Sequence, residues 1–358
     1  MDYQQIITTT AQRVAPFVVD AVHGSSVLAA RVLANPKPWN MGQYEQNPIQ
    51  VSELTTNGDF VGLGQFDTAD ESTDINLQFT AKGFYQNITL PTALISLNQT
   101  EAGIIDLVKR KMDAAKGALQ DRLCNRLYGL GTGDAIEGLQ LQTDNATYSS
   151  SYGNQSRSTY GSYINGQVTA AAGGVISFAT IRTQADLCSA ASSSNDEPNL
   201  FLTTKAVWAN VETLAEAKSR SNYDSMRGYL RVSPYTPMGT AVPMQDLPAG
   251  VANFNSLLIG GVPMVKDDKC PTGLFYTLNE RYLKFVSLSL QGLKTISMQQ
   301  AVTRGTLDEN PVKSTAFQIT DERMPTNSLG TVQQMIVYGN FINYNPKRSG
   351  VLTGVTGV

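Results

Sequence analysis

The chain has 358 residues and a formal net charge of -3. This length allows two or three packed units of roughly 100 to 200 residues each, and the near-neutral charge provides no overall attraction to nucleic acid or to an acidic membrane. Three scattered cysteines and one histidine exclude a zinc site of the usual paired spacing. No stretch is apolar for the roughly 18 residues that a membrane span needs, and no export signal is visible. We therefore expect a protein that is neither exported nor membrane-spanning, with reduced cysteines.

Residues 1–50 are predicted to form an extended N-terminal arm. A short amphipathic patch runs from Val14 to Val22, and three prolines at positions 36, 38 and 48 then interrupt the chain. Proline removes a backbone donor and restricts its neighbour, so no regular element is expected between them. Such a segment must find its packing partner elsewhere.

Residues 51–90 are predicted to form a long protruding hairpin. Ile75, Leu77 and Phe79 alternate with polar residues, as in a strand with one apolar face, and Asn57-Gly58 is a turn signal. Between residues 52 and 80 the sequence has no base and six acids, which are Glu53, Asp59, Asp67, Asp70, Glu71 and Asp74. Their spacing is not that of a calcium loop, so no metal site is predicted. The alternative to an acidic arm is an ordinary solvated loop.

Residues 99–128 carry the clearest helical pattern. One apolar stripe recurs at intervals of three or four residues, through Ile104, Val108, Met112, Ala115, Leu119, Leu123 and Leu127. Asn98 and Glu101 have a spacing similar to that of a capping box. The basic residues on the other faces include Lys109, Arg110, Lys116, Arg122 and Arg126. This pattern predicts a long helix that lies across a sheet and offers positive charge to a neighbour.

Gly129, Gly131 and Gly133 follow that helix directly, in the stretch GLGTGDAIEGL. A phosphate-binding loop must precede a helix, because the backbone N–H groups and the positive end of the helix dipole lie at its N-terminus. Here the loop meets the C-terminal end, where carbonyl oxygens would repel a phosphate. We interpret these glycines as the turn that ends the helix, with Gly129 as its left-handed residue.

Residues 143–170 are rich in Ser, Tyr, Gly and Asn, and we expect a surface insertion that buries little core. The tyrosines could alternatively form a contact surface. From residue 171 the pattern becomes mixed, with helices expected near 178–191 and 205–219, the second capped by Thr204. The runs expected to be strands are NLFLT, NSLLIGG, VPMVKD, GLFYTLN, YLKFVSLSL, STAFQIT and VQQMIVYGNFINYN. This mixture of helices and largely antiparallel strands indicates an α+β body.

No catalytic or cofactor-binding residue is predicted. The sequence contains no serine elbow and no cysteine in a context that would activate it. Its one histidine, His23, lies in the predicted arm. An enzyme is therefore the least favoured class.

The order of these features resembles the major capsid protein of tailed bacteriophages, with its Hong Kong 97 type fold, over nearly the whole chain. Three stretches carry the resemblance: ALQDRLCNRLYGLGTGDAIEGL, then GGVPMVKDDKCPTGLFYTLNERYLKF, and finally FQITDERM followed by VQQMIVYGNFINYNPKRSGVLTG. The first is similar to the end of the family's spine helix and the passage after it. The other two are similar to its central body and closing strands.

The resemblance implies a division of the chain. Residues 1–50 would be the N-arm, 51–90 the E-loop, 91–142 with 312–358 the peripheral P-domain, and 171–311 the axial A-domain. Most members of the family have no catalytic site. One member joins an E-loop lysine to a P-domain asparagine, but the only lysine near this hairpin is Lys82 and no partner could be matched, so that reaction is not carried over.

The resemblance also implies a function. Copies of the chain would assemble as pentamers and hexamers into an icosahedral shell around double-stranded DNA, in the cytoplasm of a bacterial host, and the shell would become part of the virion. Besides other copies, the expected partners are a separate scaffolding protein, a portal and decoration proteins; the DNA would be enclosed without specific readout. The acids at 67, 70, 71 and 74 are predicted to contact the basic face of a neighbour's spine helix.

Two other classes remain open. An encapsulin compartment has the same fold without phage DNA, usually with a shorter hairpin, so the 51–90 segment favours the phage shell. A polymeric surface protein would explain the Ser/Tyr-rich stretch, but it should carry an export signal.

Overall fold

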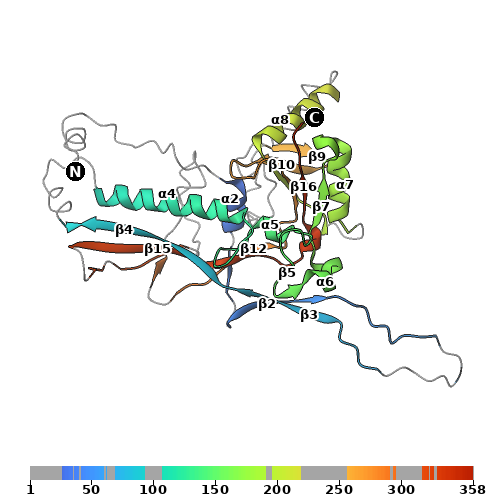
Figure 1. The fold of residues 1–358 in the computed structure, drawn as a ribbon, viewed down its shortest axis with the longest axis horizontal. Helices are drawn as coiled ribbons and strands as arrows, with labels where there is room; N and C mark the ends of the chain where they lie inside the picture. Colours follow the sequence, from blue (N-terminus) through green and yellow to red (C-terminus); the bar gives the residue numbers. More distant parts are fainter. Residues whose placement is uncertain are drawn as a thin grey trace, which may run out of the picture.

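The computed structural model describes residues 26–34, 36–39, 42–59, 62, 69–92, 107–190, 196–218, 256–290, 293–295, 317–321, 323–325 and 329–357. The chain forms an α+β molecule, as predicted. Figure 1 shows a long helix lying along a β-ribbon, a second sheet with helices beside it, and a hairpin that leads away from both.

The long helix α4, Leu107–Leu127, packs on two paired strands. These are β4, Lys82–Pro91, and β15, Gly330–Asn343, which run antiparallel. The predicted apolar stripe is the reason, because Leu119, Leu123 and Leu127 are each at most 1% exposed. They share one core with Ala115, Ile88, Leu90, Met335 and Val337. The predicted end of the helix at residue 128 is confirmed to within one residue, whereas Ile104 and the Asn98–Glu101 cap lie outside the described residues.

The sheet under α4 is built around β15, whose length lets it pair with β4 along its first part and with β12 along its last part. The strand order is β1-β12-β15-β14-β13, with β4 also on β15. The remaining bounds are β1 Lys37–Pro38, β12 Leu283–Ser287, β13 Lys294–Thr295 and β14 Phe317–Ile319.

The prediction of an extended arm over residues 1–50 is wrong for residues 27–34. Residues Val27–Ala34 form helix α2, which packs against α4 and β12. The stretch VLAARVLA is apolar on nearly every side, which favours a fully buried helix rather than a solvated arm. Its one charged residue, Arg31, is 2% exposed and forms a two-pronged ion pair with buried Glu280. The patch from Val14 to Val22 lies outside the described residues.

The prediction that no regular element forms between the prolines at 36, 38 and 48 is also wrong. Pro38 ends β1, and Pro48 lies inside β2, Tyr44–Gln50. Both strands lie at the edge of their sheets, where a missing N–H leaves no ladder hydrogen bond unmade.

The projecting hairpin begins and ends earlier than predicted. Strand β2 pairs with β3, Asp74–Thr80, from Tyr44↔Thr80 to Gln50↔Asp74. Residues 51–59 and 69–73 continue this hairpin away from the body (Figure 1). Strand β4, which the prediction placed in the hairpin, belongs instead to the sheet under α4.

The second sheet has the order β7-β16-β11-β8-β10-β9. Its strands are Gln167–Ala170, Gly350–Thr353, Phe275–Leu278, Leu200–Thr203, Val262–Lys266 and Ser256–Ile259, in that spatial order. A short 3-10 turn, η1, spans Ala172–Gly174. The predicted helices are confirmed as α7, Phe178–Cys188, and α8, Lys205–Lys218. Thr204 accepts a hydrogen bond from the Val207 N–H at 3.4 Å, as its predicted capping role requires.

The prediction that residues 143–170 form a surface insertion with little core is wrong. After α5, Leu139–Gln142, this stretch makes a small hairpin and a helix, and its last strand joins the second sheet. Tyr152 and Ile164 are buried in one core with Leu77 and Phe79 of β3. The elements are β5 Ser151–Tyr152, β6 Gln155–Ser156 and α6 Arg157–Ile164, and a 3-10 turn, η5 Pro346–Arg348, lies against α6.

Candidate functional site

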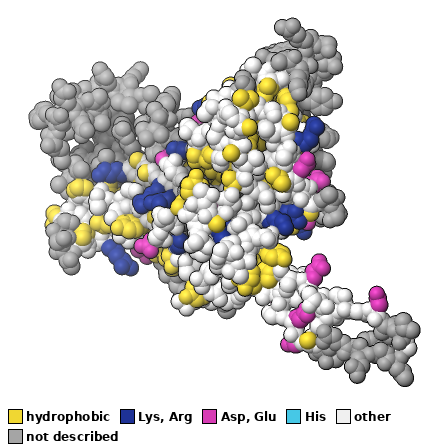
Figure 2. Space-filling view, turned by 45° about the vertical axis from the view of Figure 1, so that its right-hand side comes forward, with side chains coloured by type: hydrophobic (Ala, Val, Ile, Leu, Met, Phe, Trp, Pro, Cys, Tyr) yellow, Lys and Arg dark blue, Asp and Glu magenta, His cyan; other side chains and the backbone are white. Residues whose placement is uncertain are grey.

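The projecting arm carries exposed negative charge. Glu53, Asp59, Asp70 and Asp74 are exposed on its two segments, and Asp67 lies outside the described residues. Figure 2 shows acidic side chains along the arm, whereas the body carries side chains of both signs. The described part of the arm is therefore an acidic surface that extends beyond the core.

Glu71 differs from the other acids because it joins the two segments of the arm, residues 51–59 and 69–73. Its carboxylate accepts hydrogen bonds from the N–H of Thr55 at 2.7 Å and from the Thr55 hydroxyl. These bonds lower the pKa of Glu71, the hydroxyl contributing most. Nearer the body, the Val51 N–H donates to the Thr73 carbonyl at 2.9 Å. Glu71 is thus a brace within one chain, which weakens its predicted role as a contact to a neighbour.

The basic residues of α4 divide into three kinds. Arg126 is exposed, and Arg122 is exposed with its guanidinium 5.3 Å from the centre of the Phe84 ring. Lys116 lies 3.8 Å from Asp113 one turn earlier. The side chains of Lys109 and Arg110 lie outside what the structure describes. Arg122 and Arg126 are therefore the clearest cationic groups that this helix offers to a partner.

The acidic arm and α4 extend toward opposite ends of the molecule (Figure 1). The charges that the sequence prediction paired would consequently meet between copies of the chain rather than within one copy.

The root of the arm contains a charge cluster that sequence reasoning missed. The Glu45 side chain on β2 is fully buried, with Lys37 Nζ 2.7 Å from its Oε1 and the Tyr344 hydroxyl at 3.1 Å. Burial alone would lower the pKa of Lys37, but hydrogen bonds to Glu45 and Tyr344 outweigh burial and raise it above 10.5. Lys37 and Glu45 are eight positions apart, but Tyr344 comes from the far end of the chain, so no local sequence pattern could have indicated the whole cluster.

A second polar group lies where β3 leads into β4. Lys82 Nζ is 3.2 Å from Glu137 Oε1 and 3.3 Å from the carbonyl of Gly131. The Asn340 side chain accepts from the Glu137 N–H at 3.1 Å and donates to the Thr80 carbonyl at 3.1 Å. Backbone groups occupy both ends of this amide, so its arrangement is that of a structural bridge.

The glycine turn has a geometry different from the one predicted. Gly129 is not left-handed; the positive φ angles belong to Gly131, at 74°, and Gly133, at 62°. The tightest position is Gly138, where a Cβ atom would lie 2.5 Å from the carbonyl oxygens of Arg126 and Gly129. The I-E-G-L stretch therefore folds back directly onto the end of α4.

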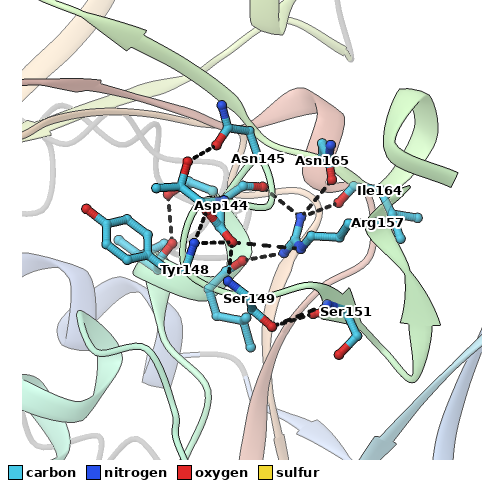
Figure 3. Close-up of polar contacts among 12 residues, drawn as sticks. Asp144, Asn145, Tyr148, Ser149, Ser151, Arg157, Ile164 and Asn165 are labelled. Atoms are coloured by element: carbon cyan, nitrogen blue, oxygen red, sulfur yellow. Dashed lines mark hydrogen bonds and ion pairs between the residues drawn. The ribbon is translucent and has the colours of Figure 1, made fainter. Parts of the chain in front are cut away.

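Asp144 and Arg157 explain why a polar stretch can enter the core (Figure 3). Arg157 is 2% exposed and donates to the carbonyls of Leu141 and Asp144, both at 2.7 Å, and of Ile164 at 3.0 Å. The Asp144 carboxylate accepts the backbone N–H groups of residues 147–149. Burial lowers the pKa of Arg157, and Asp144 opposes that change. The two charged groups thus supply hydrogen bonds that the loop backbone could not otherwise make without water.

The turn between β5 and β6 is a feature that the sequence could have predicted. Gly153 and Asn154 both have positive φ, at 55° and 65°, as the two-residue primed turn of a hairpin requires. The dipeptide Gly-Asn between two short polar runs could have predicted this hairpin.

Cys124, Cys188 and Cys270, which the sequence predicted to be reduced, are all buried and not joined by disulfides in the structure. Burial raises the pKa of Cys124 and of Cys188 to about 12, which makes these thiols unreactive near neutral pH. Among the described residues, no group of His, Cys, Asp and Glu could hold a metal ion, and no helix is long and apolar enough to cross a membrane. His23 lies outside this part of the chain.

Comparison with known proteins identifies the fold. No family model and no curated protein matches the sequence. The cyanophage A-1(L) capsid asymmetric unit aligns with a TM-score of 0.69 and 14% identity over 97% of each chain. The capsid structure of cyanophage P-SCSP1u aligns with a TM-score of 0.52 and 11% identity, over 97% of this chain and 94% of that one. The SrpI encapsulin of Synechococcus elongatus PCC 7942 aligns with a TM-score of 0.50 and 11% identity, over 99% of this chain and 96% of that one.

These matches define the class to which the fold belongs. The chain has the Hong Kong 97 type capsid fold along nearly its whole length, as the sequence resemblance predicted.

Proposed function

We propose that this chain is the major capsid protein of a tailed phage and that many copies form the icosahedral head shell around double-stranded DNA. The observation that carries the proposal is the acidic arm, which projects from a body whose fold is shared with phage capsid structures. An arm of this length can reach a neighbouring copy while the body packs against others. The chain acts by assembly, and no catalysis is assigned to it.

The energetics suit a closed lattice. A subunit that spreads its binding over several neighbours needs only weak individual contacts, because each contact, once made, raises the effective concentration for the next. In this proposal the hairpin of β2 and β3 would act as the E-loop, β4 and residues 91–142 with 312–358 as the P-domain, and residues 171–311 as the A-domain at the pentamer and hexamer centres. The residues before β2 would contribute the N-arm, with α2 anchored in the core.

The arm would lie over the spine helix of an adjacent subunit. Asp70 and Asp74 are exposed on the arm, and Arg122 and Arg126 are exposed on α4. Scaffolding, portal and decoration proteins would complete the particle, which assembles in the host cytoplasm and becomes part of the virion. The near-neutral net charge suits a wall that encloses DNA without binding it tightly.

Electron microscopy of the purified full chain tests the proposal. Closed particles with diameters of tens of nanometres are expected, if necessary with a co-expressed scaffolding protein. Monomers or open fibres under all assembly conditions would contradict it.

An encapsulin-type compartment is the second candidate, because the SrpI encapsulin has the same fold. The higher TM-score of the cyanophage A-1(L) capsid favours the phage shell. Particles isolated from the native source distinguish the two: packaged genomic DNA indicates a phage head, and an enclosed protein cargo indicates a compartment.

A further inference from the structure

The base of the arm is held on both of its strands by polar side chains from other elements of the fold. On β2, buried Glu45 meets Lys37 of β1 and the Tyr344 hydroxyl just after β15. Where β3 leads into β4, Lys82 meets Glu137 of the glycine turn at 3.2 Å. We call these two contacts, with the strands β2 and β3, the arm root.

Backbone groups of the arm root are held as well. The Asn47 side chain donates to the Tyr344 carbonyl at 2.9 Å, and the Asn340 side chain donates to the Thr80 carbonyl at 3.1 Å. On the opposite edge, the Gln78 N–H donates to the Gly153 carbonyl at 2.9 Å. The root is therefore attached to the end of β15 on one side and to the β5–β6 hairpin on the other.

The arm beyond the root is attached differently. The hydrogen bonds described for residues 51–59 and 71–73 join the two strands of the arm to each other or close local turns, as between Thr55 and Glu71 or Val51 and Thr73. The change from body contacts to contacts within the arm occurs at Gln50 and Asp74, where the β2–β3 ladder ends.

Glu45 gives this attachment a preferred geometry. A buried carboxylate is strongly unfavourable unless it is paired and hydrogen-bonded. Glu45 finds Lys37 and Tyr344 together only while β2 lies against β1 and the end of β15. Any rotation of the hairpin that separates these elements would leave the charge buried without them or expose apolar neighbours.

We propose that the arm root is a rigid joint, held by charged side chains, that sets the direction in which the arm leaves the subunit. Lys37, Glu45 and Tyr344 hold β2 in place, and the ion pair of Lys82 with Glu137 holds the junction of β3 and β4. The consequence for the shell rests on the proposed function: a fixed direction lets the arm reach one defined position on a neighbour and so keeps shell curvature uniform.

Hydrogen exchange of the unassembled full chain tests the joint without requiring a shell. Lys37→Met removes the cation from buried Glu45, and amides of residues 44–50 and 74–80 are expected to exchange at least about tenfold faster while those of α4 do not change. Lys37→Arg keeps the charge and should restore most of the protection. The matched control is Lys205→Met, which removes one partner of the exposed pair between Lys205 and Asp268 and should leave the arm root protected.

Lys82→Met provides a second variant if Lys37→Met does not fold, and it should accelerate exchange at the β3–β4 junction. If amide exchange at the arm root is unchanged in the folded variants, or is accelerated equally in α4, the proposal of a rigid joint is wrong. When the variants are assembled, a broader distribution of particle diameters than for the unaltered chain is expected, and an unchanged distribution overturns the link to curvature. A chain that never forms particles but shows the exchange pattern contradicts the shell and leaves the joint intact.

Discussion

Arg157 shows at the scale of one residue how a polar stretch becomes part of a core. Its guanidinium satisfies the carbonyls of Leu141, Asp144 and Ile164 at a depth where water does not reach. Arginine suits this position because its planar fork presents several donors in a rigid array. A compositional rule classes residues 143–170 as surface because it counts Ser, Gly and Asn and cannot count hydrogen bonds made at a distance.

Replacing Arg157 by Met should leave those carbonyls and Asp144 without their buried partner. We expect the free energy of unfolding to fall by about 3–5 kcal/mol, as for other buried pairs broken on one side. Urea denaturation of the unassembled subunit measures this change. Arg182→Met, at an exposed position on α7, is the control and should stay within about 0.5 kcal/mol; equal effects for the two variants would contradict the role of Arg157.

Glu71 predicts a pH effect in the arm. Because its pKa in the folded chain is below the ordinary value of 4.5, the brace to Thr55 is fully present above that value and is lost as pH falls through the lowered pKa. Protection of the Thr55 amide should therefore be constant near neutral pH and decline only in acid.

Glu71→Gln tests the brace, since it should reduce protection of the Thr55 amide at neutral pH and remove the acid-dependent step. Amide exchange followed by NMR or mass spectrometry at several pH values measures both. The same acid-dependent loss in the Gln variant would show that another group is responsible.

At the scale of elements, the end of α4 depends on how closely the following turn approaches it. The sequence predicted that the glycines end the helix, but it assigned the left-handed backbone to Gly129 rather than to Gly131 and Gly133. The closest approach is at Gly138, which the motif contains but which local propensity does not single out. The need for glycine at position 138 comes from backbone packing across the turn, where the Arg126 and Gly129 carbonyls leave no space for a side chain.

Two alanine substitutions separate close packing from backbone strain. Gly138→Ala places a methyl group on two backbone carbonyls that cannot move independently, so a loss of about 3 kcal/mol is expected. Gly133→Ala has no atom within 4 Å of the new Cβ and should cost only about 1 kcal/mol for its left-handed φ. Thermal and urea unfolding rank the two variants, and a larger effect at Gly133 would be inconsistent with this assignment.

The whole molecule combines a packed body with an arm that makes its described contacts within itself beyond Gln50 and Asp74. Surface charge pairs within one protein contribute little, but the same pair repeated across a lattice of copies can decide whether assembly occurs. The acidic arm and the exposed arginines of α4 are complementary in sign, and the arm and α4 extend toward opposite ends of the molecule (Figure 1).

Reversing the charge of Asp70 and Asp74 to Lys should impair assembly while the subunit stays folded, and Glu71 is left unchanged because it braces the arm. We expect the particle yield at low salt to fall at least about tenfold, with the difference from the unaltered chain shrinking at high salt. Size-exclusion chromatography and electron microscopy measure the yield. Asp186→Lys, on the exposed face of α7, is the control; particles forming normally from the arm variant would refute the charge contact.

The sequence by itself determined the elements whose signal is local. The α4 stripe, the helices α7 and α8, the strands β8 to β12, β14 and β15, and the fold class follow from periodicity and motif order, because local patterns of buried residues indicate each of them. Only the tertiary structure decided where α2 packs and how Pro48 is accommodated in an edge strand. It also decided why residues 143–170 enter the core and which residues hold the arm root in place. The position of α2 and the hold on the arm root depend on contacts such as that of Arg31 with Glu280 or of Glu45 with Tyr344, whose partners are more than 200 positions apart. A local pattern does not record them, because their energy exists only once the chain has brought both partners out of water.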